Sequence, residues 1–338
     1  MGKKVTIRDI AKRANVSVTT VSQVLNGKGN RFSKSTCDKV FKLRDEMQYV
    51  PDFHARSLIM QGSVSTIGVL IPDLSEPFFG TFVEGVQKVA REQNVIPLVF
   101  SANRDPKLEK EYLQQMVSRA IDGLIIASAR MTTDTIKQAL GNLDIPFILF
   151  DRNNAQEGTR VQTDDFHGGQ IAAQHLIDLG HKKMVYLSVD KDTENFQHRL
   201  SGFEKVLKDN GINFDESTDV LYSELSREGG EAAAKDVVAS GATAVFCGND
   251  DMAIGLLKGL RELDVRVPED ISVIGYDDIS LDEYVYPRLT TVHQPIYDLG
   301  VGATEILLDR LNDKDVDEKV EKFPVHLVER ESTARPAK

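Results

Sequence analysis

Apolar residues in the first 50 positions recur at helical spacing, in three short runs separated by polar breaks. Thr6, Ser17 and Ser33 each stand directly before one run, where a hydroxyl side chain can cap a helix. We therefore predict a three-helix unit over residues 1–50. The helix-like stretch that follows is too short to be stable alone, so we interpret residues 51–63 as a linker.

From residue 66 onward the pattern changes to short apolar strands that alternate with amphipathic helices. The predicted strands cover residues 67–71, 95–100, 124–127, 147–150, 184–188, 244–247 and 273–275. The predicted helices cover residues 78–93, 107–119, 133–140, 168–179, 198–210, 228–239 and 252–263. This alternation is typical of parallel sheets with both faces covered, and the two series predict two similar α/β lobes with a cleft at the strand ends.

The net charge of −11 hides a division along the chain. Residues 1–62 carry 12 Lys and Arg against 5 Asp and Glu, a net of +7, which leaves −18 on the remainder. A basic head on an acidic body indicates a polyanionic partner for one end only.

Several classes of protein are not expected from this sequence. It has no apolar stretch of membrane-spanning length and no apolar signal segment at its start, and Cys37 and Cys247 fall in different predicted units. We therefore expect a cytoplasmic protein without a membrane partner, structural metal or cofactor. Phosphate-loop, nucleophile-elbow and dinucleotide motifs are missing, which argues against an enzyme acting on a sugar or nucleotide. The acid pairs at 164–165, 250–251 and 277–278 are interpreted as functional or capping groups beside solvent-facing charges.

The basic head has the pattern of a helix-turn-helix, whose second helix lies in the major groove of DNA. Its outward residues are Val18, Thr19, Ser22 and Gln23, of which Thr19 and Gln23 can bond base edges and Val18 can contact a thymine methyl. The residues predicted to position the protein on the backbone are Thr6, Ser17, Thr20, Asn26 and Tyr49. A basic three-helix bundle with another role is the alternative.

Residues 5–27, VTIRDIAKRANVSVTTVSQVLNG, closely resemble the start of the lactose/galactose-repressor (LacI/GalR) family. Further family marks follow along nearly the whole chain, at Tyr49–Pro51, Ala55–Leu58, Ile67–Val69, Asp122–Ile125, Gly248–Ala253, Ile274–Asp278 and Leu289–Val292. The resemblance implies an all-α helix-turn-helix domain, then a two-lobed α/β effector domain similar to periplasmic sugar-binding proteins. It also implies a homodimer on a palindromic operator.

The resemblance gives the linker a role as a hinge helix that enters the minor groove. Leu58 matches the leucine that wedges a central base step in this family, and Ala55 and Arg56 match its neighbours. Ordinary packing of Leu58 in the linker is the alternative.

The family's chain crosses between lobes three times, which by position falls near residues 161, 291 and 323. The expected effector domain covers 64–332, with lobe one at 64–161 and 292–322, lobe two at 162–290 and 323–332, and a tail at 333–338. We expect the dimer contacts on lobe one, around the helix near residues 82–90.

Candidate sugar ligands stand at loop ends after the predicted strands. Sugars need apolar rings against their C–H faces and polar groups for their hydroxyls. The set comprises Phe78, Phe79, Asn103, Asp151, Arg152, Arg199, Asn249, Asp277 and Gln294, and it resembles the ligand set of ribose-binding proteins and ribose repressors. Phe78 can instead be core, Asn249 and Asp277 helix caps, and Arg199 a surface ion pair.

These observations predict a repressor of a sugar utilisation operon that ribose releases from its operator. Sucrose- and fructose-responsive repressors share an Asp-Arg at the matching place, so a fructoside is one alternative effector. A carbon-control regulator that answers to a phosphocarrier protein is another. Sugar and operator must weaken each other's binding reciprocally, with a coupling free energy on the order of 1–3 kcal/mol.

Overall fold

The computed structural model separates into two units, residues 1–64 and 65–338, and each is treated by itself. It describes residues 5–25, 29–47, 49, 65–128, 131–150, 158–189, 193–312 and 320–337. The linker 51–63 lies outside these residues, and so do six predicted site residues: Asn26, Ala55, Arg56, Leu58, Asp151 and Arg152.

The described part of the first unit is a three-helix domain. Its elements are α1 (Ile7–Ala14), α2 (Val18–Leu25), the 3-10 helix η1 (Gly29–Arg31) and α3 (Lys34–Glu46). The Ser33 hydroxyl accepts a hydrogen bond from the Thr36 amide at 3.2 Å, so it caps α3 as its position predicted. The buried core holds Ile10, Ala11, Ala14, Val21, Val24 and Val40. Capped short helices around one small core form the expected helix-turn-helix fold.

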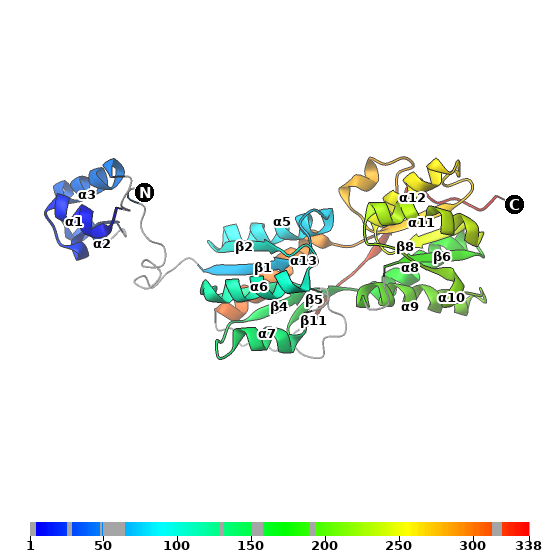
Figure 1. Ribbon diagram of the computed structural model, residues 1–338, viewed down its shortest axis with the longest axis horizontal. Helices are drawn as coiled ribbons and strands as arrows, with labels where there is room; N and C mark the ends of the chain where they lie inside the picture. The colour runs from blue at the N-terminus through cyan, green and yellow to red at the C-terminus, as the bar shows by residue number, and fades with distance from the viewer. Residues whose placement is uncertain are drawn as a thin grey trace. The chain divides into compact units, whose positions relative to one another are not determined.

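The first sheet of the second unit has six parallel strands in the order β11-β5-β4-β3-β1-β2 (Figure 1). Its strands are β1 (Thr66–Ile71), β2 (Ile96–Ser101), β3 (Gly123–Ala127), β4 (Phe147–Phe150), β5 (Arg160–Thr163) and β11 (Val320–Phe323). Its helices are α5 (Pro77–Glu92), α6 (Pro106–Ser118), α7 (Thr133–Leu140) and α13 (Ile296–Leu311). We call this sheet with its helices the first lobe.

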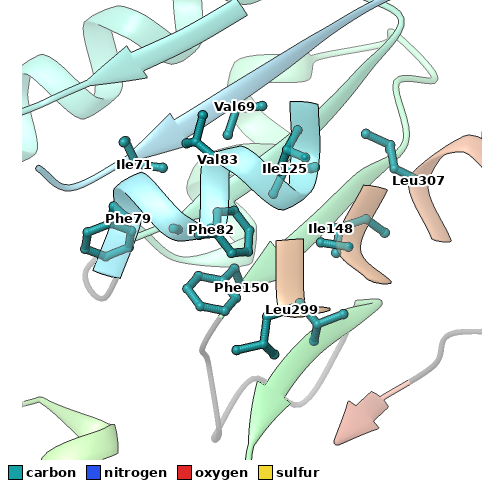
Figure 2. Packing of buried hydrophobic residues seen from close by; sticks show 14 of the residues in the cluster. Val69, Ile71, Phe79, Phe82, Val83, Ile125, Ile148, Phe150, Leu299 and Leu307 are labelled. Carbon is teal, nitrogen blue, oxygen red and sulfur yellow. The ribbon is translucent and has the colours of Figure 1, made fainter. Parts of the chain in front are cut away.

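Two apolar clusters cover the two faces of this sheet. On one face Val69, Ile125 and Ile148 meet α5 and α13 (Figure 2). On the other, Leu70 and Ile126 pack against α6 and α7. Phe82, Val83, Val86, Val89 and Ala90 of α5 are buried, so the apolar face of this helix packs inside the lobe. The dimer contact expected around this helix stays a prediction.

The second sheet has the order β12-β10-β9-β8-β6-β7, parallel except for β12, which runs antiparallel to β10. Its strands are β6 (Met184–Ser188), β7 (Val220–Tyr222), β8 (Ala244–Cys247), β9 (Ser272–Asp277), β10 (Thr290–His293) and β12 (His326–Val328). Its helices are α8 (Asp165–Asp178), α9 (Glu194–Asp209), α10 (Glu216–Asp219), α11 (Arg227–Ser240), α12 (Asp250–Glu262) and the 3-10 helix η2 (Ser280–Glu283). This is the second lobe, and it too has an apolar cluster on each face.

The chain passes between the lobes at three points, close to the positions expected near residues 161, 291 and 323. The crossing expected near residue 161 comes after Thr163, because β5 continues alongside β11, with Thr163 opposite Phe323. The crossing expected near 291 comes after His293, because β10 pairs with β9 through that residue. The third follows Phe323, where β11 ends, as expected.

The last residues also belong to the second lobe rather than to a free tail. The Ala334 amide donates to Ser272 Oγ at 3.0 Å, and His175 Nε2 lies 2.9 Å from the Thr333 hydroxyl. Ser332 is fully buried. These bonds extend the folded lobe beyond residue 332.

Three helix pairs approach each other closely, and each does so through two glycines. A side-chain carbon added to any of them would lie 1.9–2.1 Å from a backbone oxygen of the partner helix. The pairs are Gly85 and Gly300 for α5 with α13, Gly169 and Gly202 for α8 with α9, and Gly230 and Gly255 for α11 with α12. These glycines set the spacing of the helices that flank both sheets.

Within the described part of the chain, no helix is both long enough and apolar enough to cross a membrane.

Candidate functional site

The second unit has a partly open cavity of about 110 Å³ where loops from both lobes meet. Its walls are Pro72, Glu76, Phe78, Phe79, Arg104, Ala127, Ser128, Phe150, Thr193, Asn195, Phe196, Arg199, Leu225, Asn249, Asp277 and Gln294. Most of these follow the carboxyl ends of parallel strands, which is the edge where α/β sheets bind ligands. The cavity thus lies where the sequence predicted the cleft.

Six of the nine predicted ligand residues line this cavity: Phe78, Phe79, Arg199, Asn249, Asp277 and Gln294. Asp151 and Arg152 lie outside the described residues. Asn103 is exposed and absent from the walls, and its neighbour Arg104 takes the place expected for it. The backbone explains this difference, because both residues have positive φ, 49° and 57°, and the chain turns sharply between them.

The first lobe supplies an aromatic wall. Phe78 and Phe79 lie in the first turn of α5, with ring centroids 5.1 Å apart and an edge-to-face arrangement. Phe78 also lies 5.9 Å from the ring of Phe150. Both residues are 9% exposed, so they belong to the core cluster and to the cavity at once. Phe196 faces the same cavity from the second lobe.

Arg199 is a buried cation held from several sides. Its Nε donates to Asp165 Oδ1 at 2.8 Å, its Nη1 donates to the Gly248 carbonyl at 2.6 Å, and its guanidinium lies 3.7 Å from the centroid of the Tyr276 ring. Burial by itself lowers the pKa of Arg199, but the neighbouring acidic groups together, with Asp165 the strongest of them, outweigh burial and raise the pKa. Arg199 is therefore charged and preoriented toward the cavity, and it is not a surface ion pair.

Asn249, Asp277 and Gln294 each make a hydrogen bond within the protein as well as facing the cavity. Asn249 Oδ1 caps α12 by accepting from the Met252 amide at 2.9 Å. Gln294 Nε2 donates to Asp277 Oδ1 at 2.6 Å, and Gln294 Oε1 accepts from the Thr163 hydroxyl at 2.8 Å. Gln294 thereby ties the ends of β5 and β9 together at the inter-lobe crossings.

Asp277 is the acidic wall of the second lobe. Burial, followed by the nearby charge of Asp250, raises the pKa of Asp277 well above its usual value. A carboxyl group in this state can donate a hydrogen bond as well as accept one.

Sequence reasoning missed Glu76 and Arg104, which form an ion pair on the wall of the first lobe. Burial raises the pKa of Glu76, and the charge of Arg104 opposes this shift. Both residues follow a strand at its carboxyl end, and this position is the signal that could have revealed them.

The acid pairs are engaged by the protein. Asp165 is buried against Arg199, and its partly exposed neighbour Asp164 caps α8. Asp250 Oδ2 accepts from the amides of Asp278 and Ile279, and Asp278 accepts from Arg330 Nη2 at 2.6 Å. The described residues contain no cluster of three or more His, Cys, Asp or Glu arranged to hold a metal ion.

In the first unit, the start of α2 presents the predicted DNA-contacting residues. Ser17, Val18 and Thr19 are exposed, and Val18 is 42% exposed despite being apolar. Ser17 Oγ accepts from the Thr20 amide at 3.0 Å and so caps α2, which is an additional role for this predicted phosphate contact.

The structure also describes the predicted DNA contacts Thr6, Ser22, Gln23 and Tyr49. Ser22 and Gln23 are half-buried on α2, and Tyr49 is half-buried after α3. The Thr6 amide donates to Asp9 Oδ2 at 2.8 Å, and the Thr6 hydroxyl donates to the same oxygen at 2.6 Å, which fixes the start of α1.

Comparisons with known proteins agree with both units. Residues 6–52 match the model of bacterial regulatory proteins of the lacI family, and residues 173–333 match the periplasmic binding protein-like domain. The HTH-type transcriptional repressor PurR of Vibrio atlanticus is 34% identical over 96% of this chain and 97% of its own length. The chain belongs to the lacI family of bacterial regulatory proteins. This lacI-family member is therefore a DNA-binding transcriptional regulator rather than an enzyme.

Solved structures similar to this lacI-family chain differ in what they bind. A regulator of the family from Enterococcus faecium, with bound ribose, is 37% identical, covers 80% of this chain and 99% of its own, and has a TM-score of 0.75. The lac repressor dimer bound to operator and the anti-inducer ONPF is 26% identical, covers 98% of this chain and 100% of its own, and has a TM-score of 0.84.

Proposed function

We propose that this regulator represses a sugar utilisation operon and that a bound neutral sugar, ribose, releases it from its operator. The observation that carries the proposal is the composition of the cavity. Phe78 and Phe79 of the first lobe face the same space as Arg199, Asn249 and Asp277 of the second. Aromatic rings suit the C–H faces of a sugar, and the polar groups suit its hydroxyls.

A ligand held by both lobes binds their closed arrangement more tightly than their open one, and it therefore shifts the protein toward the closed arrangement. Gln294 bonds to Thr163 and Asp277, so the cavity wall is joined directly to two inter-lobe crossings. This contact gives a physical route by which an occupied cavity changes the relation of the lobes, and with it the fit of a dimer to DNA.

A purine base is the second candidate effector. The relative from Vibrio atlanticus, a PurR repressor, aligns with nearly the whole chain at 34% identity, which favours this reading. The ribose-bound relatives from Enterococcus faecium and Enterococcus faecalis are 37% and 38% identical and each covers 80% of this chain, which favours ribose. The acidic wall at Asp277 serves a polyhydroxy ligand well, because each hydroxyl can donate to a carboxyl oxygen.

Titration calorimetry of the full chain against D-ribose, D-fructose, sucrose, hypoxanthine and guanine tests the proposal. The expected order places D-ribose first. Tighter binding of a fructoside or a purine would overturn the ribose assignment. Binding of the phosphocarrier protein in place of every small ligand would favour the carbon-control alternative.

The Arg199→Lys variant tests the site, since it keeps the charge but loses the fork of donors. Loss of one charge-assisted hydrogen bond, about 1.5–3 kcal/mol, should weaken ligand binding by about ten- to a hundredfold. Arg261→Lys is the matched control, because Arg261 is exposed on α12 of the same lobe. If both variants bound the ligand equally tightly, Arg199 would not be a ligand-binding residue.

For the DNA side, we propose that Val18, Thr19, Ser22 and Gln23 read base edges in each half of a palindromic operator, bound by a homodimer. Linker residues Ala55, Arg56 and Leu58 are proposed to enter the minor groove, with Leu58 as the wedge. A Leu58→Ala protein should bend operator DNA less and bind it more weakly. If a gel-shift phasing assay showed unchanged bending of the operator, Leu58 would not be the wedge.

A further inference from the structure

Glu76 and Arg104 form a charged pair at the edge of the cavity that the proposed function leaves without a role. Glu76 directly precedes α5, Arg104 follows β2, and Arg104 Nη2 donates to Glu76 Oε1. The Arg104 backbone amide donates to the Pro72 carbonyl at 3.1 Å, which fixes the turn that carries the side chain. The Glu76 side chain is 16% exposed and that of Arg104 is 41% exposed, so the carboxylate lies inward and the guanidinium outward.

Each of the two arginines that line the described cavity is bonded to a carboxylate. Arg104 pairs with Glu76, and Arg199 pairs with Asp165. Asp277 adds a further acidic group to the walls. The walls that the structure describes therefore present hydrogen-bonding groups without a surplus of positive charge.

Glu76 also stands at the N-terminus of α5, a position that by itself favours anions. The dipole of a helix start attracts a phosphate. In α5 this dipole is the main attraction, because Pro77 has no N–H and the Phe79 amide already donates to the Glu76 carbonyl at 3.1 Å. The Glu76 side chain makes no capping hydrogen bond to α5, so its carboxylate is not there to complete the helix. Its negative charge nevertheless opposes any second anion at that end. Asp73 and Asp251 act on Glu76 as further negative charges.

We propose that the Glu76–Arg104 pair is a specificity filter that admits uncharged polyhydroxy ligands and rejects their phosphorylated forms. The inference rests on the proposed function and names the class of ligand that the same cavity takes. Glu76 acts by neutralising both features that would attract a phosphate, the Arg104 guanidinium and the start of α5. Its carboxyl oxygens remain acceptors for a ligand hydroxyl.

The test compares D-ribose with D-ribose 5-phosphate by titration calorimetry on the full chain. Wild-type protein should bind D-ribose and bind the phosphate ester far more weakly. Glu76→Gln keeps the shape of the side chain but frees Arg104. One recovered charge-assisted contact, about 1.5–3 kcal/mol, should raise the affinity for the ester relative to D-ribose by about tenfold or more.

Two further variants separate this effect from a general disturbance. Glu111→Gln removes one negative charge from an exposed position on α6 of the same lobe and should leave the ratio of the two affinities unchanged. Adding Arg104→Gln to Glu76→Gln should abolish the gained binding of the ester. The gain should also shrink as salt rises, because it is electrostatic.

The outcomes distinguish the two proposals. The filter is overturned if wild-type protein binds D-ribose and D-ribose 5-phosphate equally well. It is also overturned if the ratio of the two affinities in Glu76→Gln stays within about twofold of the wild-type ratio, a difference of less than about 0.5 kcal/mol. Either result leaves the proposed sugar effector unaffected. Wild-type protein that binds neither D-ribose nor another neutral sugar overturns both.

Discussion

The contact between α8 and α9 offers a direct test of how the fold positions the cavity. Gly169 of α8 faces the backbone of Arg199 on α9, and a side-chain carbon built on Gly169 would lie 1.9 Å from the Arg199 carbonyl oxygen. Such carbons essentially never lie closer than 3.0 Å to another heavy atom. A Gly169→Ala substitution must therefore push the two helices apart by at least about 1 Å at this point.

The expected loss of stability follows from two opposing contributions. Replacing glycine by alanine inside a helix stabilises it by about 1 kcal/mol. Overpacking a close contact costs about 1–3 kcal/mol, and the upper end applies here because the clashing atom is backbone and cannot rotate away. The Gly169→Ala protein should therefore unfold at lower denaturant, with a net loss of about 1–2 kcal/mol. It should also bind ligand more weakly, because Arg199 moves with α9.

Gly80→Ala is the matched control. Gly80 lies in α5, and a side-chain carbon at this position would have no atom within 4 Å. This substitution should be neutral or should raise stability by about 0.5–1 kcal/mol. Urea unfolding of both variants, together with ligand calorimetry, measures the difference. A Gly169→Ala protein as stable as the Gly80→Ala protein, with unchanged ligand affinity, would refute this reasoning.

Three further predictions address other parts of the chain. Ser33→Ala removes the cap of α3 and should reduce the protection of its first amides from hydrogen exchange by about 1 kcal/mol, whereas unchanged exchange would show the cap to be dispensable. Burial, with the charge of Asp250, raises the pKa of Asp282 to about 11 in the folded state. The protein therefore loses stability as the pH rises above about 4, the pKa of this carboxyl in the unfolded chain. Asp282→Asn should accordingly stabilise the fold more at pH 8 than at pH 5. An equal effect at both pH values would contradict the raised pKa. Gln23→Ala should bind the operator more weakly by about 1–3 kcal/mol and should bind random DNA almost as well as the wild type. An equal loss of affinity for both DNAs would show that Gln23 contacts phosphates instead of base edges.

Much of the fold could be predicted because its signals are local. The helix caps at Ser17 and Ser33 and the fully buried strands such as Gly123–Ala127 depend on residues adjacent in sequence. The edge strand Val320–Phe323 gave no comparable signal, because it is short and its residues are half-buried or exposed. Its existence depends on pairing with Arg160–Thr163, which is distant in sequence.

The site was predictable in outline for the same reason. Residues that follow strands reach the cleft, so Arg199 and Asp277 lie on its walls. Whether Asn103 or Arg104 faces inward depends on two positive φ angles, which the residue types do not reveal. The bond from Thr163 to Gln294 joins residues 131 positions apart, so this contact could not be predicted from the neighbours of either residue in the sequence.

The coupling between cavity and operator is the central claim, and fluorescence anisotropy measures it directly. An operator can be selected from a random DNA pool with the full chain, and its affinity then measured with and without saturating D-ribose at fixed salt. We predict that D-ribose weakens operator binding by about 5- to 150-fold, which corresponds to 1–3 kcal/mol of coupling. Unchanged affinity would contradict the account, and tighter binding would make the sugar a corepressor instead of an inducer.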